Sequence, residues 1–212
     1  MSARWSALRI PAKTAPLGAA VAAALLGSAA VFAAPAAAKE IKVCLIAGKT
    51  GALEAYAKQT ENGFMMGLEF LTKGTMQVGA DKLTVLVKDD QLKPDRGKSL
   101  LEECYGDDKA DVAVGTTGSP IALAMLPVAE EFKKVLIVEP AVADSITGEK
   151  WNRYVFRTGL SSTQDAYAAA AAIPAGEEVS IGMMALDTAF GRDGVAAFKE
   201  ALAAIRPKAK IV

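Results

Sequence analysis

Short apolar runs alternate with amphipathic segments from residue 41 onward, and this alternation constrains the fold more than any other feature. The apolar runs predict strands at 41–47, 83–87, 112–114, 135–138 and 154–157. Apolar residues at helical spacing and helix-start signals predict helices between them, at 55–73, 94–105 and 119–132. Strands and helices of these lengths form a parallel sheet covered on both faces. The sequence therefore predicts an α/β fold with a doubly wound parallel sheet.

The segments after residue 158 form a second, shorter block. Its predicted elements are a helix at 165–173 capped by Ser162 or Thr163, a strand at 179–184, a helix at 191–205 and a strand beginning at 210. Two helices and two strands are too few for a stable doubly covered sheet. We therefore expect a first α/β lobe at 39–158 and a truncated second lobe at 159–212, the amino-terminal part of a longer two-lobed protein.

Residues 1–38 have the pattern of a cleaved export signal. Arg4, Arg9 and Lys13 form a basic start, an apolar run covers 17–34, and three alanines at 36–38 provide a cleavage site before Lys39. A membrane anchor is the alternative, but the run is on the short side of the ~20 apolar residues that a span needs. The pattern predicts a periplasmic protein that does not insert into the membrane after cleavage.

The charge and the cysteine content narrow the function further. Removal of the three basic signal residues leaves 21 basic against 24 acidic residues, a net charge of −3, which argues against nucleic acid as a partner. The chain has no histidine, and Cys44 and Cys104 are too far apart in sequence for a metal-ligand motif. An oxidising compartment permits a disulfide between them. Burial as two small apolar side chains is the other interpretation. No cofactor is expected.

Two short motifs suggest nucleotide binding and metal or acid–base chemistry, but the residues around them do not favour either function. Gly48-Lys49-Thr50 looks like the end of a phosphate loop, but the required first glycine would stand at Val43, so we exclude nucleotide binding. The pair Asp89-Asp90 follows a predicted strand and suggests magnesium binding or acid–base catalysis. The favoured interpretation is a solvated strand end, with Asp90 near a turn.

Three turns at the carboxyl ends of predicted strands form a candidate ligand crevice, at 115–120, 139–144 and 187–192. The first leads into a helix amino terminus, where backbone N–H groups favour an anion, and Thr117 and Ser119 add hydroxyls. Ser119 followed by Pro120 is also a typical helix cap, and the two roles are compatible. The small residues at 141–143 allow a ligand to approach the backbone.

These segments together resemble the periplasmic binding proteins of the leucine/isoleucine/valine type, which have the type I fold and serve ABC importers. The motifs that carry the resemblance are the turn at 50–56, Asn62-Gly63, Asp89-Asp90, Phe156-Arg157-Thr158 and the turn at 187–191, in the family's order. The resemblance implies a receptor rather than an enzyme, with a small carboxylate as ligand and a membrane permease as partner. An extracellular sensor domain of the same fold and an exported α/β enzyme are the alternatives. The enzyme would lack a histidine, a nucleophile elbow and a metal cluster.

The resemblance also implies a set of ligand-binding residues. Tyr56 would line the pocket, Ser119 would hold the ligand carboxylate, and Phe190 would close the pocket from the second lobe. The full predicted set is Tyr56, Thr117, Gly118, Ser119, Ala141, Val142, Ala143 and Phe190. The family's amino-acid binders tend to carry threonine where Ala143 stands and often carry tyrosine where Phe190 stands. The loss of two hydroxyls favours a carboxylate with an apolar or aromatic body, and a branched-chain or other apolar amino acid is the alternative ligand.

Overall fold

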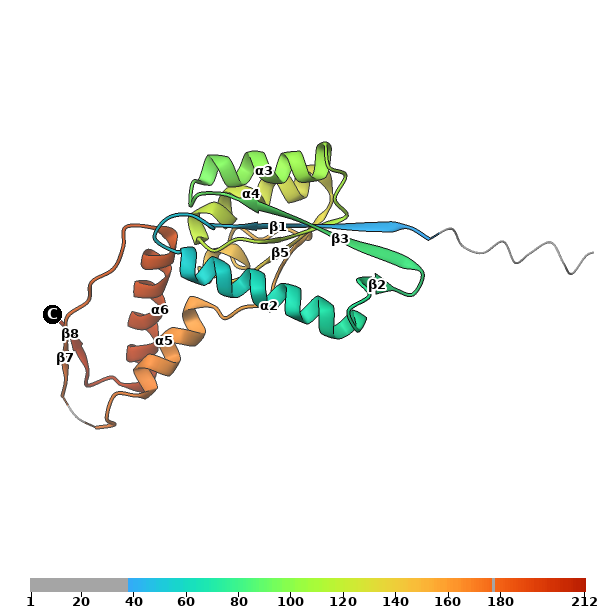
Figure 1. The fold of residues 1–212 in the computed structure, drawn as a ribbon. Coiled ribbons are helices and arrows are strands. Elements are labelled where there is room, and N and C mark those ends of the chain that lie inside the picture. The colour runs from blue at the N-terminus through green and yellow to red at the C-terminus, as the bar shows by residue number, and fades with distance from the viewer. Residues whose placement is uncertain (1–37, 177) are drawn as a thin grey trace, which may run out of the picture. The chain divides into compact units, whose positions relative to one another are not determined.

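The computed structural model describes residues 38–176 and 178–212. A six-stranded sheet has the strand order β2-β3-β1-β4-β5-β6 (Figure 1). Its strands are β1 (Glu40–Ala47), β2 (Gln77–Val78), β3 (Asp81–Asp89), β4 (Val112–Gly115), β5 (Val135–Val138) and β6 (Val155–Arg157). The neighbouring strands β3, β1, β4, β5 and β6 all pair in parallel, which confirms the predicted fold class. The short edge strand β2 pairs antiparallel with β3 and was not predicted.

Helices cover both faces of this sheet, and the alternation of side chains along β1 explains how. The helices are α2 (Glu54–Thr72), α3 (Pro94–Gly106) and α4 (Ser119–Phe132). Cys44 and Ile46 point to one face and join the core formed with α3 and α4. Val43 and Leu45 point to the other face, where Phe64 of α2 packs against them. Figure 1 shows α2 on the opposite side of β1 from α3 and α4.

The second block contains α5 (Ser162–Ala171) and α6 (Ala189–Ile205), with the short parallel strands β7 (Ser180–Ile181) and β8 (Lys210–Ile211). The strand predicted at 179–184 is shorter than expected. The cap of α5 is Ser161, whose hydroxyl accepts from the Gln164 N–H while the Gln164 side chain accepts from the Ser161 N–H. The prediction of Ser162 or Thr163 was therefore wrong, because this reciprocal capping box begins one residue earlier.

The division between lobes at residue 158 stays a prediction. The predicted export signal falls on residues 1–37, outside the described part of the chain, apart from Ala38. Among the helices at 38–176 and 178–212, none combines the length and apolar character that a membrane span requires.

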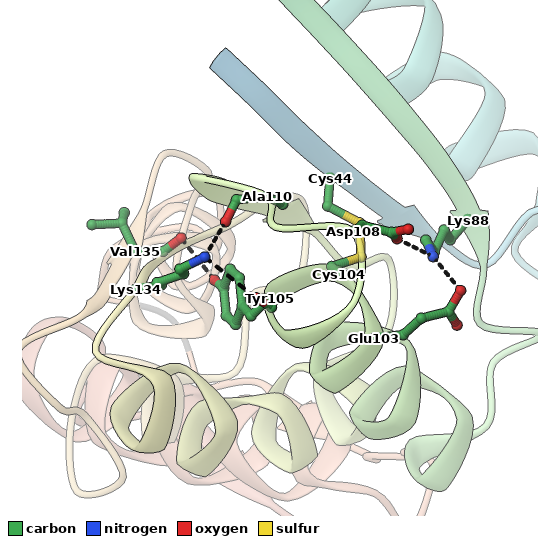
Figure 2. The surroundings of a disulfide bond; sticks show 9 residues. All are labelled: Cys44, Lys88, Glu103, Cys104, Tyr105, Asp108, Ala110, Lys134 and Val135. Carbon is green, nitrogen blue, oxygen red and sulfur yellow. Dashed lines mark hydrogen bonds and ion pairs between the residues drawn. A yellow bond between two sulfur atoms is a disulfide. The ribbon is translucent and has the colours of Figure 1, made fainter. Parts of the chain in front are cut away.

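Cys44 and Cys104 form a disulfide, which settles the alternative that the sequence left open (Figure 2). Both residues are fully buried, and their Cα atoms lie 6.1 Å apart. The bond joins β1 in the centre of the sheet to the last turn of α3. The helix that follows β3 is therefore covalently held to the first strand.

Lys88 lies beside this disulfide and links β3 to the end of α3 (Figure 2). Its Nζ is 2.6 Å from a Glu103 carboxylate oxygen and 2.5 Å from one of Asp108. Burial on its own would lower the pKa of Lys88, but the two carboxylates outweigh burial and raise this pKa above its usual value. The charged ammonium thus ties β3 to the end of α3, the same end that the disulfide joins to β1.

Candidate functional site

The loops that follow β1, β3, β4 and β5 lie at one edge of the sheet, because parallel strands place their carboxyl ends together. The strand register pairs Ile46 with Gly115 and Ala47 with Asp89. The Gly48 N–H donates to the Thr117 hydroxyl over 3.2 Å. The β1 and β4 loops are therefore joined directly at the edge where the predicted crevice lies.

Ser119 connects the start of α4 to the β5 loop. Its hydroxyl oxygen accepts from the Ala143 N–H over 3.2 Å, and its side chain is almost fully buried. Gly118 is the cap residue of α4, in extended conformation, and no side chain caps this helix. The prediction that Ser119 caps α4 was therefore wrong: the helix starts at Ser119 itself, and the hydroxyl bonds across to another loop.

This arrangement brings together polar groups of a kind that can bind an anion. The Ser119 hydroxyl and the Ala143 N–H lie within hydrogen-bonding distance of each other at the positive end of α4. The Ser119 N–H lies in the first turn of α4, where backbone N–H groups have no acceptor within the helix. Hydroxyl and backbone N–H donors at a helix amino terminus are suited to a carboxylate. Of the eight predicted binding residues, Ser119 and Ala143 are thus in direct contact.

Asp90, directly after the end of β3, holds the loop that follows β4 through its hydrogen bond with Thr116. Its carboxylate is completely buried, accepting from the Thr116 hydroxyl and, over 2.8 Å, from the Leu92 N–H. The prediction of a solvated strand end was wrong, because β3 ends beneath the β4 loop rather than at the surface. Burial, aided by the neighbouring Asp89 charge, raises the pKa of Asp90, against the hydrogen bonds from Thr116 and Leu92 and the positive Arg96.

We expect the stability of Asp90→Asn relative to wild type to increase with pH. The raised pKa means that native Asp90 holds its proton more tightly than the unfolded chain does. The stability that this provides is complete at pH values below the ordinary aspartate pKa of 3.8, and it is lost as the pH rises through the raised pKa of native Asp90. Asparagine does not ionise and can still accept from the Leu92 N–H. Urea unfolding of both proteins between about pH 3 and 8 measures the difference.

Asp89→Asn provides a control of opposite sign. The pKa of native Asp89 is lowered. The stability that its charged form provides is therefore present above pH 3.8, the ordinary aspartate pKa, and is lost as the pH falls through the lowered pKa. This variant should therefore be less stable than wild type at neutral pH, and the deficit should shrink in acid. A difference between Asp90→Asn and wild type that does not vary with pH would contradict the assignment.

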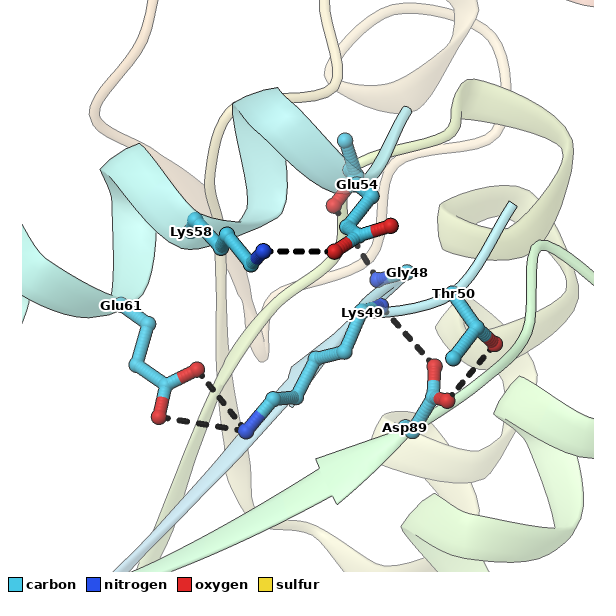
Figure 3. A network of polar contacts seen from close by, with 8 residues as sticks. Gly48, Lys49, Thr50, Glu54, Lys58, Glu61 and Asp89 are labelled. Carbon is cyan, nitrogen blue, oxygen red and sulfur yellow. Dashed lines mark hydrogen bonds and ion pairs between the residues drawn. The ribbon is translucent and has the colours of Figure 1, made fainter. Parts of the chain in front are cut away.

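Asp89, unlike Asp90, organises the loop after β1 (Figure 3). Its carboxylate accepts from the Lys49 N–H over 2.9 Å and from the Thr50 hydroxyl over 2.8 Å. Partial burial opposes ionisation, but these bonds and one from the Gln91 N–H outweigh it and lower the pKa of Asp89. The Lys49 ammonium lies 2.9 Å from a carboxylate oxygen of Glu61 on α2. Lys49 and Thr50 thus make structural contacts that hold this loop to β3 and α2.

Tyr56 and Phe190 lie at the starts of two other helices, α2 and α6. Tyr56 is 59% exposed in the first turn of α2 and lines a cavity of about 440 Å³. Gln59, Thr60, Gly63, Phe64, Val114, Glu139 and Pro140 complete its wall, which includes neither Ser119 nor Phe190. Phe190 is 48% exposed in the first turn of α6. Their predicted roles in ligand binding stay predictions.

Arg157 and Asp90 are the residues at this edge that sequence reasoning did not assign to the site. The Arg157 guanidinium donates to the carbonyl oxygens of Val142 and Ala143, over 3.2 and 2.9 Å. Its position at the end of an apolar strand was the available signal. Within 38–176 and 178–212, no group of three or more histidine, cysteine, aspartate or glutamate side chains could hold a metal ion.

Crystal structures of several binding proteins resemble this fold. One is an ABC-type branched-chain amino acid transporter from Rhodopseudomonas palustris CGA009, 63% identical, with a TM-score of 0.69 over 81% of this chain and 45% of that one. Another is the solute binding protein of an ABC transporter from R. palustris BisB5 in complex with 3,4-dihydroxybenzoic acid, 32% identical, with a TM-score of 0.71 over 82% and 46%.

A third structure is an ABC transporter solute binding protein from R. palustris in complex with benzoate, 28% identical, with a TM-score of 0.71 over 82% of this chain and 47% of that one. The present chain thus spans less than half the length of these three proteins. A comparison with curated proteins found no match. The family model described as periplasmic binding protein matches residues 40–212. On this match and the 63% identity, the chain belongs to the periplasmic binding protein family.

Proposed function

We propose that this protein is the periplasmic solute-binding component of an ABC importer and that it captures a small carboxylate between two lobes. The observation that carries the proposal is the contact between the Ser119 hydroxyl and the Ala143 N–H at the start of α4. The Ser119 hydroxyl oxygen accepts from the Ala143 N–H, and its own O–H can rotate to donate to a carboxylate that enters between the loops. Closure of the lobes around the ligand would create the form that docks on the membrane permease.

The ligand body that we favour is aromatic or otherwise apolar. Ala143 and Phe190 offer no side-chain hydroxyl to an α-amino group. The related R. palustris structures with bound benzoate and 3,4-dihydroxybenzoic acid support the same class of ligand. The relative that is 63% identical is described as a branched-chain amino acid transporter, so leucine is the ligand to test against it.

Ser119→Ala should weaken carboxylate binding about 10- to 150-fold. A hydrogen bond to a charged group contributes about 1.5–3 kcal/mol, and 1.4 kcal/mol corresponds to a factor of ten. Calorimetry with benzoate, 4-hydroxybenzoate and leucine would measure the effect. It should be carried out on the chain itself and on an extended chain, in which the carboxyl-terminal remainder of the 63% identical R. palustris protein follows Val212.

Ser99→Ala is the matched control, because Ser99 is exposed in the middle of α3 and belongs to none of the predicted binding residues. It should leave every affinity unchanged. Tight leucine binding with no response to the aromatic acids would overturn the proposed ligand body. Absence of binding to all three carboxylates by the extended chain would overturn the receptor function itself.

A further inference from the structure

The peptide group between Val142 and Ala143 connects the anion-binding edge to Arg157. Its N–H end, on Ala143, donates to the Ser119 hydroxyl. Its C=O end, on Val142, accepts from Arg157 Nη1 over 3.2 Å. This peptide bond is trans, so its N–H and C=O point in opposite directions. A group that holds the carbonyl on one side therefore also aims the N–H toward Ser119 on the other.

The carbonyl side of this loop is held by several donors. Arg157 Nη1 also donates to the Ala143 carbonyl over 2.9 Å. The Val142 carbonyl accepts in addition from the N–H and the hydroxyl of Ser162, over 2.8 and 3.2 Å. Arg157 ends β6, and Ser162 begins α5. The loop is thus fixed from the last strand of the six-stranded sheet and from the first helix of the second block.

The charge of Arg157 is not neutralised locally. No carboxylate oxygen in the described part of the chain lies within 4.0 Å of its guanidinium nitrogens. Glu139 and Asp144, the acids that flank the loop, accept hydrogen bonds from the hydroxyls of Thr158 and Thr163. A half-buried positive charge therefore lies behind the peptide whose N–H faces the anion-binding groups.

We propose that Arg157 is a positioning residue for the carboxylate site: it orients the Val142–Ala143 peptide and supplies the positive charge behind it, so that the site selects anions over neutral ligands. This inference rests on the proposed function. Arg157 acts through the peptide and its field, without touching the ligand. It explains how one serine hydroxyl and one backbone N–H can discriminate an anionic ligand from a neutral one.

The test compares benzoate with its neutral analogue benzamide, each titrated into the extended chain and its variants. Arg157→Gln removes the charge and should weaken benzoate binding about tenfold or more while changing benzamide binding much less. Arg157→Lys keeps the charge and should recover part of the loss. Arg153→Gln is the matched control: Arg153 is exposed, lies over the Tyr154 ring and should change neither affinity.

Several outcomes would overturn the inference. One is no change in benzoate affinity in Arg157→Gln. Another is an equal loss for benzoate and benzamide, which would indicate general damage to the loop. Thermal unfolding of each variant checks that it folds, and Arg157→Lys carries the test if Arg157→Gln does not. If the unmutated extended chain binds no carboxylate, both the proposed function and this inference fail. If it binds benzoate but the Arg157 variants give one of these contrary outcomes, only the role of Arg157 is overturned.

Discussion

Replacing both Cys44 and Cys104 with alanine should lower the free energy of unfolding by about 4 kcal/mol. The disulfide closes a loop across 60 positions of sequence, and a cross-link of that span removes much of the conformational freedom of the unfolded chain. Both residues are fully buried between β1 and α3, so their replacement also removes packing in the core. The effect should therefore be among the largest that any pair of side chains around the six-stranded sheet can produce.

Urea unfolding with and without a reductant would measure it. Reductant present during unfolding should bring the wild type close to the double variant and should leave the variant itself unchanged. This comparison separates the covalent bond from the packing of the two side chains. A double variant that unfolds within about 1 kcal/mol of the oxidised wild type would contradict the expected role of the bond.

Gly115→Ala should destabilise the fold by about 3 kcal/mol or more, since it combines backbone strain with overpacking. Gly115 has φ +146°, a conformation that residues with a Cβ rarely adopt. A Cβ at this position would lie 2.0 Å from the Ile46 carbonyl oxygen. Ile46 is its partner in the β1–β4 ladder, so relief of the clash would separate two central strands.

Gly67→Ala is the matched control for this substitution. Gly67 lies on the exposed side of α2, and a Cβ there would meet no atom within 4 Å. Alanine at this helical position should stabilise the protein by about 0.5–1 kcal/mol. Thermal and urea unfolding of the two variants would measure both effects. A Gly115→Ala protein as stable as wild type would show that the two strands can separate at little cost.

Apart from the short edge strand β2, the order of the strands and helices around the six-stranded sheet was predictable from the sequence, because the period of apolar residues is a local property. The predicted strand at 135–138 and the helix at 94–105 match β5 and α3 within a residue. Helix starts were less certain. Ser161, Ser162 and Thr163 are all good caps, and the reciprocal bond with Gln164 selects the first of them.

The contacts of the polar residues could not be predicted in the same way. Asp90 reads as a surface residue after a strand, yet it is buried under Thr116, 26 positions away. Ser119 reads as a helix cap, yet its hydroxyl bonds to Ala143, 24 positions away. The disulfide stayed one of two alternatives for the same reason, since it depends on where α3 crosses β1.

The sequence by itself therefore determined the α/β alternation, the turns at the strand ends and the residue types available there. Only the tertiary structure decided which of these polar groups are buried and what they bond to. The physical reason is that crossover connections and strand register set the distances between groups that are distant in sequence. The contacts of Asp90, Ser119 and Arg157 come from that register, and the proposed carboxylate site depends on them.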